Sequence, residues 1–122
     1  MDKRDNVAPR HGAIREAIGK CYALANGGLV VPWTGRHGNA LKRLLEANKS
    51  WTLQVWLNCI CNRFTSEVNL SEDPIRWLAK LPDYFRSPLD KFGKPRRLGN
   101  REEYVNPRYV EALNAILDEI EA

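Results

Sequence analysis

The stretch that most constrains the fold of this chain runs from Ser50 to Phe92. It holds three of the four tryptophans and two of the three cysteines among the 122 residues. Its first apolar side chains recur at intervals of three and four: Leu53, Trp56, Leu57, Ile60 and Phe64. That spacing is typical of one helix face, and the chain has no useful run of alternating apolar and polar residues. The sequence therefore predicts an all-α domain.

Helix start and stop signals divide the chain into five predicted helices. They cover residues 10–25, 34 or 39 to 47, 50 or 52 to 66, 71–81 and 107–121. Glycine pairs and Asn-Lys end the first two, while Ser, Thr and Asn-Pro begin the others. We expect a compact bundle of about five helices.

Two helix beginnings carry more specific predictions. Trp51 precedes the cap Thr52, so we expect it to fold back on Trp56 as a hydrophobic staple. Ser71 is the predicted cap of the fourth helix, because Pro74 then falls in the first turn, where its missing N–H costs nothing. Pro82 is expected to end that helix.

The chain is expected to form one core domain with a basic extension. Residues 1–92 form the helical core, with residues 1–9 as a frayed arm. Residues 93–105 are rich in Gly, Pro and Arg and form a linker, and residues 106–122 form a C-terminal amphipathic helix. The apolar stripe of that helix either docks on its own core or pairs with a second copy: Val110, Leu113, Leu117 and Ile120.

No known catalytic or cofactor motif occurs in the sequence, so we expect a non-enzymatic protein without cofactor or metal. The cysteines are Cys21, Cys59 and Cys61, and their spacing favours small buried residues over a metal or redox site. No apolar run is long enough to span a bilayer, and the N-terminus lacks the apolar core of a secretory signal. We therefore expect no membrane contact and a cytoplasmic location.

Charge is unevenly distributed along the chain. The net charge is +4, but residues 86–101 carry +5 and residues 102–122 carry −5. Basic residues neutralise phosphates, and interleaved aromatic side chains such as Tyr84, Phe85 and Phe92 suit base stacking. The predicted DNA-contacting residues are Arg86, Lys91, Lys94, Arg96 and Arg97, with Lys42, Arg43 and Lys49 as a second patch. The alternative is that these charges form a solvated surface.

Residues 9–95 also resemble a known pattern. Its matching positions include Gly27, Gly28, Trp33, Trp51, Trp56, Arg63, Phe64, Trp77, Tyr84, Pro88 and Phe92. This order is similar to the C-terminal helical domain of phage and prophage replication proteins, and loosely to DnaD-type helicase loaders. The resemblance implies binding of DNA or of a replisome protein during replication initiation, in a bacterial host. This chain departs from the pattern by starting at Met1 without a winged helix.

The expected function is therefore non-enzymatic DNA binding, mostly through the backbone, in phage or prophage replication. The alternative is a small phage protein of the anti-CRISPR type that binds and inhibits a host protein such as a defence nuclease. In that case the contacts would include the acidic residues of the last helix, Glu111, Asp118 and Glu119. A homodimer through the same helix is a third possibility.

Overall fold

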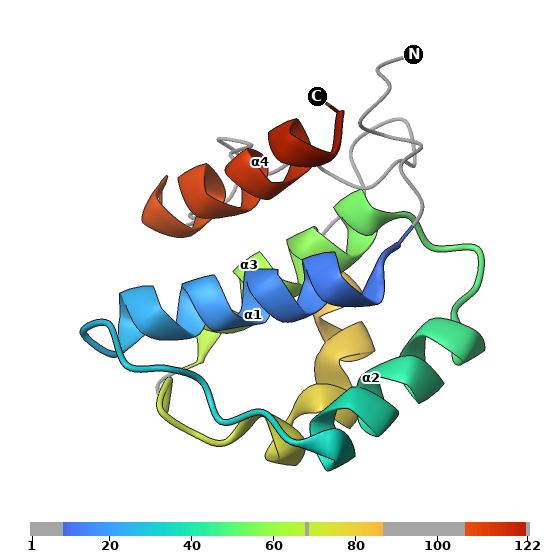
Figure 1. Cartoon of the computed structure of the whole chain (residues 1–122), viewed down its shortest axis with the longest axis horizontal. Helices are drawn as coiled ribbons and strands as arrows, with labels where there is room; N and C mark the ends of the chain where they lie inside the picture. Colours follow the sequence, from blue (N-terminus) through green and yellow to red (C-terminus); the bar gives the residue numbers. More distant parts are fainter. Residues whose placement is uncertain (1–8, 68, 87–106, 122) are drawn as a thin grey trace.

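The computed structural model describes residues 9–67, 69–86 and 107–121. They form helices throughout (Figure 1): α1 His11–Ala25, α2 Gly35–Ala47, α3 Leu53–Ser66, the 3-10 helices η2 Pro74–Arg76 and η3 Leu78–Arg86, and α4 Pro107–Glu121. No strand occurs in this part of the chain, so the prediction of an all-α bundle is confirmed. No helix within these ranges is long and apolar enough to cross a membrane.

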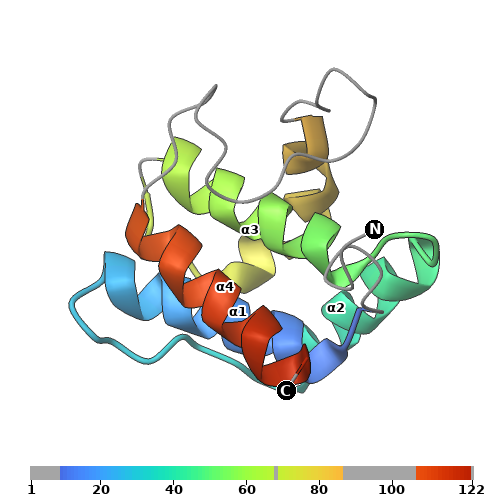
Figure 2. The ribbon, with the colours of Figure 1, turned by 90° about the horizontal axis from the view of Figure 1, so that it is seen from above.

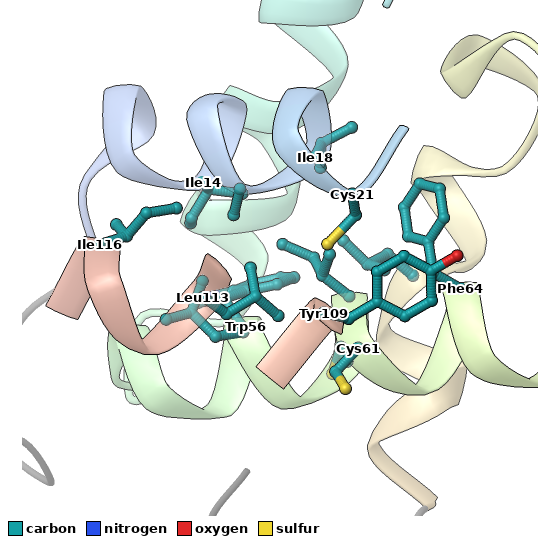
Figure 3. Packing of buried hydrophobic residues seen from close by; sticks show 14 of the residues in the cluster. Ile14, Ile18, Cys21, Trp56, Cys61, Phe64, Tyr109, Leu113 and Ile116 are labelled. Carbon is teal, nitrogen blue, oxygen red and sulfur yellow. The ribbon is translucent and has the colours of Figure 1, made fainter. Parts of the chain in front are cut away.

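Helix α3 is the centre of the bundle. Most of its side chains are buried, and it contacts α1, η3 and α4 (Figure 2). Helices α1, α3 and α4 contribute to one hydrophobic cluster, for example through Ile14, Trp56 and Leu113 (Figure 3). Leu113 and Leu117 of α4 are fully buried there, so the apolar stripe of this helix docks on its own chain.

The expected limits of α2 and α3 agree with the structure. Thr34 is the N-cap of α2, and Thr52 is the N-cap of α3. The rings of Trp51 and Trp56 lie 4.9 Å apart between centroids, which is the predicted staple. The residues just before α2 and α3 therefore predict correctly where each helix begins.

Residues 71–86 differ from the prediction of an α-helix over residues 71–81 that Pro82 ends. Asp73, not Ser71, caps the first turn, because its carboxylate accepts a 3.0 Å hydrogen bond from the N–H of Ile75. The chain then forms η2 and η3, and Pro82 lies inside η3 instead of ending a helix. An α-helix here would lose the bond from position 82 to the carbonyl of Leu78, and the proline ring would clash with that carbonyl. The chain forms 3-10 turns here instead, in which Pro82 likewise donates no hydrogen bond.

Helices α2 and α4 lie on opposite sides of the bundle. Figure 1 shows α1 and α3 between them, and no residue pair joins the two helices within the described ranges. Their exposed surfaces are consequently independent. Each can be considered as a separate site.

Candidate nucleic-acid interface

The exposed face of α2 carries the main described cluster of cations. His37 and Leu41 are buried and point to the core, while the opposite side of the helix is polar. Its exposed charged residues are Arg36, Lys42, Arg43 and Glu46, with exposed Lys49 two residues beyond the helix end. At 3.6 residues per turn, Arg36 and Arg43 lie about two turns apart, or roughly 10 Å, on one side of this face. We call these four cations the α2 patch.

The cations of the α2 patch are not paired within their own helix. Glu46 is the single acid of α2, and the described ion pairs involve none of the four cations. The segment that contacts α2 carries both signs of charge: exposed Arg76 and Lys80, and the acids Asp73 and Asp83. Exposed, unpaired cations on one helix suit contact with a phosphate backbone.

Partly buried hydrogen bonds hold the beginning of α2 in place. The N–H of Thr34 donates to His37 Nδ1 over 2.9 Å, so the ring carries its proton on Nε2. Nε2 donates to Asp73 Oδ1 over 2.6 Å, across 36 positions of sequence. The same carboxylate caps η2, and the hydrogen bonds from Ile75 and His37 lower the pKa of Asp73. His37 thus joins the starts of α2 and η2.

Two further side chains extend this anchor. The ring of Trp33 stacks on His37 with centroids 5.3 Å apart, and the Arg15 guanidinium lies 5.5 Å from the Trp33 ring centroid. The Gly35–Gly38 turn is therefore a structural helix start. The hydroxyl of Thr34 accepts from the N–H of Arg36, so this amide is already paired within the chain.

The predicted tail cations fall beyond the part of the chain that the structure describes. Arg86 ends η3, and its side chain lies outside the described residues, as do Lys91, Lys94, Arg96 and Arg97. The DNA-contact prediction for these five residues therefore stays a prediction. The same holds for stacking by Phe85 and Phe92.

Tyr84, in contrast, is engaged within the fold. Its hydroxyl donates to Glu67, and its carbonyl accepts a 3.1 Å hydrogen bond from Asn62 Nδ2. Burial and the nearby Glu67 carboxylate raise the pKa of Tyr84 to about 12. Tyr84 therefore joins η3 to the end of α3.

Arg63, one of the positions of the resemblance pattern, is a buried cation and does not face solvent. It is only 3% exposed, and its guanidinium lies 4.0 Å from the Trp77 ring centroid and 5.1 Å from that of Phe64. Its Nε and Nη1 have no hydrogen-bond partner among the residues that the structure describes, and burial lowers its pKa. Position 63 is seven residues after Trp56, so helical spacing places it on the buried stripe. The helical spacing in the sequence therefore already indicates that Arg63 is buried.

The predicted partner-binding residues lie on the other side of the molecule. Glu111, Asp118 and Glu119 are exposed on α4, away from the α2 patch. They form an acidic surface backed by the buried Leu113 and Leu117. The structure thus separates the two predicted surfaces.

Comparison of the chain with protein-family models, with curated proteins and with solved structures finds no match.

Proposed function

We propose that this chain is a non-enzymatic DNA-binding protein that contacts the phosphate backbone through the α2 patch. The observation that supports the proposal is the set of four exposed cations beside a single acid, with none of the four in a described ion pair. Each phosphate that a cation neutralises releases counterions, which gives affinity that depends on salt and little on sequence.

The position of α3 favours backbone contact over base readout. A recognition helix must expose one face to enter the major groove. Helix α3 has buried residues on every side, including Gln54, Val55 and Cys59. Helix α2 has a free face, but its cations are spread along the helix and suit phosphates.

The setting proposed for this activity is phage or prophage replication. It is supported by the resemblance of residues 9–95 to phage replication proteins and by the basic segment 86–101 of the sequence. Lys91, Lys94, Arg96 and Arg97 would add phosphate contacts to those of the α2 patch.

Anisotropy titrations of labelled single- and double-stranded DNA at several salt concentrations test the proposal. We expect the triple variant Lys42→Gln, Arg43→Gln, Lys49→Gln to bind at least about tenfold more weakly at low salt. The slope of log affinity against log salt should become shallower by about 0.9 for each duplex phosphate that the variant no longer neutralises. A parallel variant that neutralises Lys91, Lys94, Arg96 and Arg97 measures the share of the tail.

A charge-matched control distinguishes loss of the α2 patch from a general loss of net positive charge. Arg10→Gln, Lys20→Gln, Arg108→Gln removes the same charge from α1, its N-cap and α4. This control should bind DNA nearly as well as the wild type. Equally weakened binding in both triple variants, or no DNA retention by the wild type at low salt, would exclude the α2 patch as a binding site.

The acidic surface of α4 supports a second candidate, inhibition of a host protein. Glu111, Asp118 and Glu119 are exposed and lie opposite the α2 patch, so they can contact a basic protein surface. Pull-downs from host lysate with and without added nuclease distinguish the candidates. A partner that is retained after nuclease treatment, and that no longer binds when the three acids are changed to Gln or Asn, favours the inhibitor.

A further inference from the structure

The connector between α1 and α2 carries an apolar surface that neither proposed function uses. Leu29 is 60% exposed and Val30 is 89% exposed, the two large hydrophobic side chains that stand out as exposed among the described residues. Val31 and Trp33 are half-buried, whereas Val30 and Pro32 are exposed. The segment is thus extended, with one side against α1 and an apolar side facing solvent.

A groove runs between this connector and the outer face of α1. One hollow of about 520 Å³ is lined by Gly12, Gly19, Leu29 and Val30, among others. A second hollow of about 480 Å³ continues it towards α4, because both share Lys20, Ala23 and Gly28. The lining is mostly apolar, and volumes of this size are ordinary for ligand sites.

Small residues of α1 shape the floor of the groove. Gly19 lets the connector approach α1 closely, since a Cβ there would lie 3.5 Å from Val31 Cγ1, whereas a Cβ at Gly12 would meet no atom within 4 Å. From Gly12 to Ala23 the floor is about 16 Å long, since an α-helix rises 1.5 Å per residue. That length matches about five residues of an extended peptide.

The backbone of the connector has unused hydrogen-bonding groups. The N–H of Leu29 bonds to the carbonyl of Asn26, and that of Thr34 bonds to His37. Within the described part of the chain, the N–H groups of Val30 and Val31 make no hydrogen bond. A free extended edge of this kind can accept another extended segment by main-chain pairing.

The charges along the groove favour an acidic occupant. Arg15, Lys20 and Arg108 line it, against Glu16 as the single acid. Glu16 pairs with Lys20 over 3.3 Å, and Arg108 has an interaction of its own within the chain, so exposed Arg15 is the further cation that the lining offers. Apolar lining, a free backbone edge and flanking cations together describe a peptide site, since a nucleic-acid backbone would leave Leu29 and Val30 unused.

We propose that this groove binds an extended peptide of a partner protein that carries aliphatic and acidic side chains. Aliphatic side chains would cover Leu29 and Val30, carboxylates would pair with Arg15 and would replace Glu16 as the partner of Lys20, and main-chain groups would pair with Val30 or Val31. The site is separate from the α2 patch and does not depend on DNA binding.

Selection of a displayed library of random short peptides on the full chain tests the proposal. Enriched peptides should combine aliphatic residues with Asp or Glu. Titration of a labelled synthetic peptide from this pool should show at least about tenfold weaker binding to Val30→Lys and to Lys20→Glu. Amide exchange at Val30 or Val31 should slow in the complex.

The α2 variant Lys42→Gln, Arg43→Gln, Lys49→Gln is the matched control and should bind the peptide like the wild type. Val30→Lys changes an exposed side chain, and an unchanged melting temperature will show that it folds. No enrichment over empty beads, or equal peptide binding by Val30→Lys, would overturn the proposal. The proposal would also be overturned if DNA bound the α2 variant and displaced the peptide from it.

Discussion

The contact between His37 and Asp73 shows how one polar pair can fix two helix beginnings. Both ring nitrogens of His37 are used, one by the N–H of Thr34 and the other by Asp73. Asp73 also accepts from the N–H of Ile75. Removing the carboxylate therefore affects the positions of α2 and η2 together.

Asp73→Ala should lower the free energy of unfolding by about 1–2 kcal/mol, the usual cost of losing a helix cap and one hydrogen bond. The folded-state pKa of Asp73 is lowered, so its contribution is present above the unfolded pKa of about 3.9 and is lost as pH falls through the folded value. Urea unfolding of both proteins at several pH values measures this. A difference that does not shrink on acidification would contradict the assignment.

Arg63 is the residue where burial and charge conflict most. Its unpaired Nε and Nη1 cost about 1–3 kcal/mol by desolvation, while its contacts with Trp77 and Phe64 return about 0.5–2 kcal/mol. Arg63→Met keeps the aliphatic volume and removes the charge. We expect its stability to equal or exceed the wild type and its DNA affinity to stay unchanged. Weakened DNA binding by a folded Arg63→Met protein would indicate that Arg63 contributes to DNA contact.

At the scale of elements, apolar spacing predicts α1, α2 and α3 well because each has one buried stripe and clear end signals. The exposure of Lys42, Arg43 and Lys49 follows from the same spacing. Residues 71–86 were predicted wrongly because Asp73 competes with Ser71 as a cap and Pro82 favours a 3-10 helix. The bond between His37 and Asp73 had no local signal, since the two residues lie 36 positions apart in the sequence.

Helix α4 belongs energetically to the bundle. Leu113 is fully buried among residues of α1 and α3. Leu113→Ala should therefore lower the free energy of unfolding by about 2–5 kcal/mol while unfolding remains a single transition. Denaturant titrations by fluorescence and circular dichroism should coincide. Two separated transitions, or stability that rises with protein concentration, would indicate an independent or dimeric α4.

At the scale of the whole molecule, the three cysteines report on opening of the core. Burial raises the pKa of all three thiols, to about 12 for Cys59 and about 11 for Cys61. Cys21 lies on α1 and the other two on α3, and all three are buried. Figure 3 shows Cys21 and Cys61 among apolar side chains.

Native protein at mildly alkaline pH should react with a thiol reagent slowly and at the rate of unfolding, because only opened chains expose thiolates. Dithionitrobenzoate absorbance, with and without denaturant, measures this. Rapid labelling of one thiol in folded protein would show local opening around that residue.

Among the described residues, the placement of α2 and α4 on opposite sides separates charge, positive along α2 and negative along α4. The electric field of a polyanion orients such a molecule before contact. A larger share of its encounters with the polyanion then begins in the productive orientation. Association would be faster than net charge alone allows, and this advantage would fade as salt shortens the Debye length. Each bound copy would then present the same acidic helix outwards.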